Sequence, residues 1–243
     1  MIESYTIVVQ WGLRKESVEA CAARTLQLLT CLARHNDIFS HWFTLGSTRE
    51  EALQHEISLE DPATIQSLLI EGRSKSELRA DLLEQLGYSI GLWTGRKDDD
   101  AGLSINCGCY APAIGGNSCV LELPYEGAAA EQLLHASVLE GIMACVVEAW
   151  NPDWGVVTSN KYEKIAPAQS PNTPWMGWMI YLAHKPETLP PLPAPVSVGT
   201  MGNQGSLITM TNERFTADNP SHIEIVNQVR DRLAQKGVFK SPA

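Results

Sequence analysis

The sequence predicts a single α+β domain over residues 1–243, in which helices pack on a mostly antiparallel β-sheet. Short β-branched and aromatic runs alternate with segments whose apolar residues recur at helical spacing. Between residues 88 and 124, three such runs follow one another with turn residues between them, as in an antiparallel meander. No repeat, low-complexity tract or linker divides the chain, which is long enough to form one large core.

The first third of the chain predicts a strand, a long helix and then short elements. The run YTIVVQWG predicts a strand at 5–12. Ser17 is placed as the N-cap of a helix over about 18–35, whose apolar residues recur on one side. A short strand or turn is expected at 41–47, followed by short helices at 48–54, 61–72 and 74–87, the last two stopped by Gly72 and Gly87.

The rest of the chain predicts most of the sheet and two more helices. Residues 128–150 are apolar on more than one side, which indicates a helix buried in the middle of the domain. Asn219 and Pro220 fit the N-cap and first position of a last helix that Gly237 stops. Residues 160–174 predict a polar loop, and 185–195 a proline-rich extended connector. Strands are expected at 88–95, 103–111, 117–124, 153–159 and 175–183, and a hairpin at 196–211.

The charge and the N-terminal residues limit the possible partners. A net charge of −10 argues against direct nucleic-acid binding, which needs Lys and Arg to neutralise phosphates, and suits a basic partner. No apolar run reaches the roughly 18 residues of a membrane-spanning helix, so no membrane association is expected. The start MIESYTIVVQWG does not resemble a secretory signal, which predicts a cytoplasmic protein.

The cysteines are expected to be buried thiols. They fall mostly in apolar periodic segments, and a reducing compartment would keep them unpaired. The spacing of Cys107 and Cys109, with Cys119 further on, is not that of a structural zinc site, and no fourth ligand is evident. We therefore predict neither a metal site nor another cofactor. The six cysteines are Cys21, Cys31, Cys107, Cys109, Cys119 and Cys145.

No catalytic constellation is evident, so the chain is predicted not to be an enzyme. It contains neither a GxSxG nucleophile elbow nor a glycine-rich nucleotide-binding fingerprint, and its six histidines are scattered. Three consecutive aspartates, Asp98, Asp99 and Asp100, follow Arg96 at a hairpin tip. General acid–base catalysis would need a buried partner to perturb one of these carboxylates, and none is identifiable. A solvated turn and a contact for a basic protein are the two simpler interpretations.

Two of the seven tryptophans lie beside segments that could contact a partner. Trp93 borders the acidic tip, and Trp175 closes the expected loop at 160–174. Core packing is the usual role of so large a side chain, but tryptophan is also a preferred anchor at protein interfaces.

Several motifs, in order along nearly the whole chain, resemble the immunity protein 52 family of bacterial polymorphic-toxin systems. These motifs are TIVVQWGLRKES near the N-terminus, GLWTGR at 91–96, NSCVLELP at 117–124, EAWNPDWGVVTS at 148–159, PWMGWMIYL at 174–182, and GSLITMTNERF followed by the NPSH helix start.

The resemblance implies an antitoxin that binds a cognate secreted toxin, often one delivered by a type VI secretion system, and blocks it. The family's toxins look like nucleases of the restriction-endonuclease fold, which act on cytoplasmic DNA and present a basic cleft that an acidic protein can occupy. The resemblance transfers no catalytic residues, so the expected toxin contacts come from this sequence alone. They are Trp93, Arg96, Asp98, Asp99, Asp100, Glu163, Lys164 and Trp175.

Two other functions stay open at this stage. An uncharacterised hydrolase would need a concave pocket containing titratable groups of perturbed pKa. A small-ligand-binding protein would need an apolar pocket lined by the tryptophans.

Overall fold

The fold is that of a computed structural model, which describes residues 2–73, 84–97, 99–112, 116–167, 173–202 and 205–239. Within these residues, one sheet of nine strands runs in the order β2-β3-β4-β5-β1-β6-β7-β9-β8, and all neighbours pair antiparallel. The expected α+β class with a mostly antiparallel sheet is therefore confirmed. The strands are β1 (Tyr5–Trp11), β2 (Phe43–Thr44), β3 (Tyr88–Trp93), β4 (Gly102–Cys107), β5 (Asn117–Glu122), β6 (Trp154–Ser159), β7 (Met179–Leu182), β8 (Ser197–Met201) and β9 (Gly205–Thr209).

Most of the described helices begin at a capping side chain. Ser17 accepts the Ala20 N–H at the start of α1, and Asn219 accepts the Ser221 N–H at the start of α8. Gly237 ends α8 with a φ of 76°, in the left-handed conformation that glycine adopts most easily. The described helices are α1 (Val18–His35), α2 (Arg49–Ala52), α3 (Pro62–Glu71), α5 (Gly127–Leu133), α6 (Ala136–Trp150), α7 (Asn160–Ile165) and α8 (Pro220–Lys236), with short 3₁₀ turns η1 (Asp37–Phe39) and η2 (Pro186–Thr188).

The expected single helix over 128–150 is wrong, because the structure has α5 and α6 at an angle of 81°. The break falls at Leu134, whose φ of −83° and ψ of 51° are not helical. Leu133, Leu134 and Ala136 are all buried at the bend, so it lets both helices keep their apolar residues in the core.

Two other expectations differ from the structure, and a third concerns residues that lie mostly outside the described ranges. The first six residues of the expected loop at 160–174 form α7, because Ser159 caps its start and Tyr162 is buried. The expected strand over 175–183 contracts to β7: the Trp178 N–H still donates to the Val157 carbonyl of β6, but Gly177 before it lies against the side chains of Val156 and Thr158. The expected helix at 74–87 lies mostly outside the described residues.

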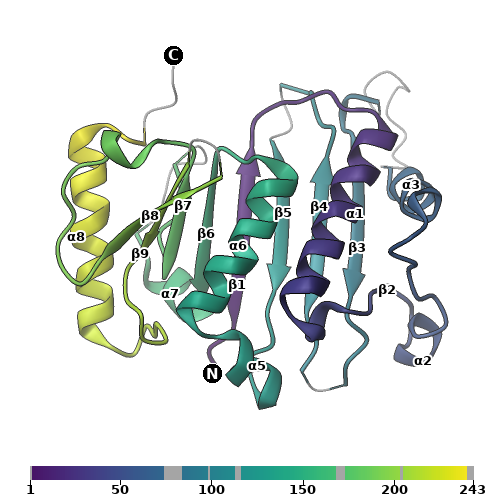
Figure 1. The fold of residues 1–243 in the computed structure, drawn as a ribbon, viewed down its shortest axis with the longest axis horizontal. Helices are drawn as coiled ribbons and strands as arrows, with labels where there is room; N and C mark the ends of the chain where they lie inside the picture. The colour runs from purple at the N-terminus through teal and green to yellow at the C-terminus, as the bar shows by residue number, and fades with distance from the viewer. Residues whose placement is uncertain are drawn as a thin grey trace.

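The two halves of the sheet are covered differently. Helices α1 and α6 lie side by side across one face (Figure 1). In β6, β7 and β9 every residue is buried, so both faces of these three strands are covered, whereas edge strand β8 is mostly exposed. In β3, β4 and β5, burial alternates along each strand. One face of this second half therefore packs under the helices, while the other meets solvent.

A nearly buried carboxylate fixes the end of α6. The side chain of Glu16, 9% exposed, accepts hydrogen bonds from Nε of Arg14 at 2.9 Å and Nε of Arg24 at 2.7 Å. The same guanidinium groups donate to the Trp150 and Ala149 carbonyls, at 3.0 and 2.8 Å. These carbonyls belong to the last turn of α6, where cations are favoured by the unpaired C=O groups and the helix dipole.

Replacing Glu16 by Gln should lower the free energy of unfolding by about 1–3 kcal/mol, because two partly buried arginines lose their shared counter-charge. Urea denaturation measures this change. Glu84→Gln is the matched control, since Glu84 pairs with Lys15 on the surface, where the side chains are 55% and 66% exposed. The control should keep the wild-type midpoint, because exposed ion pairs add little stability. Equal midpoints for both variants would contradict a structural role for the Glu16 cluster.

Candidate functional site

The acidic tip is the turn between β3 and β4, residues 94–101. Thr94 closes the turn by accepting the Ala101 N–H through its hydroxyl at 2.9 Å. Arg96 donates twice to Asp99, at 3.0 and 3.3 Å, and this bonding raises the pKa of Arg96. Asp100 is exposed, and Asp98 lies outside the described residues. The tip thus presents Asp100 to solvent, while the charge of Asp99 is already paired within the turn.

Two further acidic residues that were not singled out from the sequence lie near the tip. Glu122 ends β5 directly opposite Gly102, and its Oε2 would be 3.2 Å from a Cβ placed there. Glu126 is exposed and precedes Gly127, where an added Cβ would lie 3.8 Å from the Asp99 Cβ. The alternation in LSINC and NSCVLE could have revealed Glu122 as an outward residue, but its strand partner depends on register, which the sequence does not specify.

Glu163 and Lys164 lie on α7 and not in a loop. Both are exposed, and partial burial of its carboxylate raises the pKa of Glu163. The strand register places Trp93, at the start of the acidic tip, in one row with Thr158, which lies just before α7. The acidic tip and α7 therefore lie at the same end of the strands. Four strand spacings separate β3 from β6, which corresponds to a distance of about 19 Å across the sheet. The structure therefore does not bring α7 and the acidic tip into one cluster.

The two tryptophans are anchored differently. Trp93 packs on Phe43 with ring centroids 6.4 Å apart, and its indole N–H donates to the Thr44 carbonyl at 3.2 Å. Trp175 is 38% exposed and lies 6.2 Å from the ring of Trp154. Each ring is thus held on one side by another aromatic ring and remains partly accessible.

The expectation that all six cysteines are thiols is wrong, because Cys31 and Cys145 form a disulfide. They are 114 residues apart in the sequence, and only the packing of α1 beside α6 brings them together. The other four, Cys21, Cys107, Cys109 and Cys119, are buried. A hydrogen bond with Cys21, together with burial, raises the pKa of Cys107, and burial raises that of Cys119. These two thiols therefore stay protonated and unreactive.

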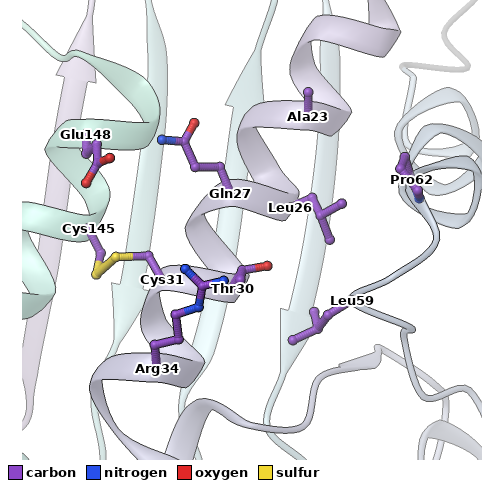
Figure 2. A pocket seen from close by; sticks show the side chains of 10 residues that line it. All are labelled: Ala23, Leu26, Gln27, Thr30, Cys31, Arg34, Leu59, Pro62, Cys145 and Glu148. Carbon is purple, nitrogen blue, oxygen red and sulfur yellow. A yellow bond between two sulfur atoms is a disulfide. The ribbon is translucent and has the colours of Figure 1, made fainter.

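A cavity of about 440 Å³ lies beside the disulfide, between α1, α6 and the start of α3. Figure 2 shows most of its lining side chains coming from α1, with Cys145 and Glu148 from α6 and Leu59 and Pro62 on the other side. It contains neither a histidine nor a tryptophan. This lining lacks both the perturbed acid–base pair of a hydrolase site and the aromatic walls expected of a small-ligand site.

The described residues contain no group of three or more His, Cys, Asp or Glu side chains placed to hold a metal ion. No single described helix is long and apolar enough to cross a membrane, although α5 and α6 would meet that test together if they were not bent.

Comparison with known protein families favours one of the remaining interpretations. A family model described as immunity protein 52 matches residues 3–242, nearly the whole chain. The chain belongs to the immunity protein 52 family. The resemblance noted in the sequence is therefore confirmed, and membership of this immunity protein 52 (Imm52) family supports an immunity role and suggests a non-enzymatic one.

The fold is also similar to a solved structure. The Pseudomonas aeruginosa type VI secretion system (T6SS) protein PA0821 superposes with a TM-score of 0.50 at 9% identity, over 93% of this chain and 76% of that chain. At this identity the likeness concerns the fold. A search of curated protein sequences found no match.

The Cys31–Cys145 bond should contribute measurably to stability. Replacing both cysteines by Ser should lower the free energy of unfolding by about 3–5 kcal/mol, because the bond closes a loop of more than a hundred residues in the unfolded chain. Denaturation with and without reductant measures the effect: reductant should destabilise the wild type and leave the double variant unchanged. The same stability for oxidised wild type and double variant would contradict the prediction.

Proposed function

We propose that this protein is an antitoxin that binds and neutralises a cognate secreted toxin, a T6SS effector nuclease of restriction-endonuclease type. The single observation that carries the proposal is the immunity protein 52 match over residues 3–242. The T6SS protein with a similar fold adds support for the secretion system. In this proposal the protein acts by contact alone, and its partner is the toxin and neither nucleic acid nor a membrane.

The charge distribution supports a nuclease as the partner. A nuclease presents a basic cleft to phosphates, and a protein of net charge −10 is attracted to such a cleft over long range. The acidic tip and its neighbours Glu122 and Glu126 supply exposed carboxylates at one edge of the sheet. The sheet and the helix start hold the backbone of these residues, which limits the conformational entropy lost when they engage a partner.

The compartment follows from the proposed target. A nuclease toxin acts on DNA in the cytoplasm, so we place the antitoxin there. The Cys31–Cys145 disulfide would instead favour an oxidising compartment, because such bonds persist mainly there. Alkylation of free thiols in intact cells, followed by mass spectrometry, separates the two cases. Labelled Cys31 and Cys145 support the cytoplasm, and an intact disulfide supports an oxidising compartment.

A pull-down tests the proposal directly. The tagged protein is incubated with the C-terminal domain of the adjacent gene product, and nuclease activity is measured on the eluate. We expect a stable complex with suppressed nuclease activity. Failure to bind, with a metabolic enzyme encoded next door, would overturn the antitoxin function. A stable complex that suppresses a different toxic activity would keep the antitoxin function and overturn the nuclease.

Replacing Asp98, Asp99 and Asp100 by Ala should weaken toxin binding more than about tenfold, because a basic partner loses its attraction to the tip. Titration calorimetry measures the affinity. The matched control removes three exposed carboxylates from the other end of the molecule, Glu187, Glu224 and Asp231, with the same change in net charge. Wild-type affinity in the tip variant would remove the acidic-tip contact and leave the antitoxin function intact.

A further inference from the structure

In the described part of the chain, the outward side of β3, β4 and β5 is partly open to solvent, whereas Val8 of β1 on the same side is buried. Pairing register puts the outward residues in three rows across β3, β4, β5 and β1. The rows are Trp93–Gly102–Glu122–Thr6, Gly91–Ser104–Val120–Val8 and Ser89–Asn106–Ser118–Gln10. We call these residues the open face. Ser104, Asn106 and Glu122 are exposed, whereas the alternate residues of the same strands, such as Leu103 and Ile105, are buried under the helices.

Aromatic side chains border the open face on both sides. On one side, Trp93 packs with Phe43, and Leu45, 68% exposed, reaches over Gly91. On the other side, the rows continue into β6 at Thr158, Val156 and Trp154. The segment before β7 covers them: Gly177 lies against Val156 and Thr158, and Trp175 against Trp154. Trp93 and Trp175, distant in the sequence, thus border the same face.

The floor of the open face, meaning the residues of the three rows between these borders, has many small side chains and almost no charge. Glycine and serine provide much of it, and Glu122 is the only charged residue in the three rows. Glycines within strands often mark places where another backbone approaches closely. Solvated faces of antiparallel sheets are ordinarily polar, but the centres of protein interfaces are depleted of charge and use tryptophan as anchors. The floor also lacks Lys and Arg, which would repel a basic partner.

We propose that the open face is the surface on which the toxin docks, with a basic segment lying between Trp93 and Trp175. The proposal rests on the antitoxin function and specifies its contact surface. The distance from β3 to β6, about 19 Å, accommodates an α-helix of about 10–12 Å diameter or a β-hairpin. Charge complementarity selects the occupant: Glu122 lies on the face, and Asp100 lies on the tip at its edge, so a basic element of the toxin fits.

The test places bulk and positive charge on the floor without touching the core. Ser104→Arg combined with Asn106→Arg alters two exposed outward positions of β4. Affinity for the toxin domain should fall by more than about 100-fold, because the centre of the interface is blocked and repelled. The matched control is Gln228→Arg combined with Gln235→Arg on the exposed side of α8, with the same added charge. The control should bind within about threefold of wild type, as distant surface changes do.

Hydroxyl-radical footprinting of the wild-type complex gives an independent measurement. Trp93, Trp175 and Val120 should be oxidised more slowly in the complex than in the free protein. Wild-type affinity of the β4 variant, together with unchanged oxidation at these residues, would overturn the open face as the docking surface and keep the antitoxin function. If the wild-type protein does not bind the toxin domain at all, the antitoxin function fails and this proposal fails with it.

Discussion

The arrangement of the domain depends on how α6 is held. Glu16, nearly buried, orients Arg14 and Arg24 so that both guanidinium groups donate to the last carbonyls of α6. The same corner stacks Trp11 of β1 on Trp150 of α6, with ring centroids 4.9 Å apart and Arg14 over the Trp11 ring. Strand β1 and helix α6 are thereby joined by charge and by aromatic packing at one point. The disulfide from Cys31 to Cys145 then ties α1 to the middle of α6.

Placing α1 and α6 together on one face has a direct consequence for the other face. In the other half of the sheet, every residue of β6, β7 and β9 is buried, so both faces of these three strands are covered. In β3, β4 and β5 the outward residues remain accessible. The accessible surface is therefore rigid, because it is made of paired strands whose inner side chains are fixed in the core. Rigid surfaces lose little entropy on binding, which suits a protein that must hold a toxin tightly.

Membership of the immunity protein 52 family suggests a role that depends on a binding surface and not on catalysis. Two of the buried thiols, Cys107 and Cys119, have a raised pKa where a nucleophile would need a lowered one, and the cavity beside the disulfide lacks an acid–base pair. The chain does supply exposed carboxylates at one end of the strands, beside an open face that is almost uncharged. Such a combination allows long-range attraction of a basic partner and close contact once the partner arrives.

The sequence by itself determined the α+β class, most strands, the caps of α1 and α8 and the acidic tip, because alternation, helical spacing and capping are local properties. Its motifs were also sufficient to indicate the immunity protein 52 family. Local patterns could not give the break at Leu134, since both sides of the bend are apolar and only the packing decides where the helix turns. The disulfide was missed for a similar reason. Its two cysteines are 114 residues apart, and the helices that carry them must first lie side by side. The open face was decided by tertiary structure alone, because strand order and register determine which outward residues become neighbours, and these depend on contacts between distant parts of the chain.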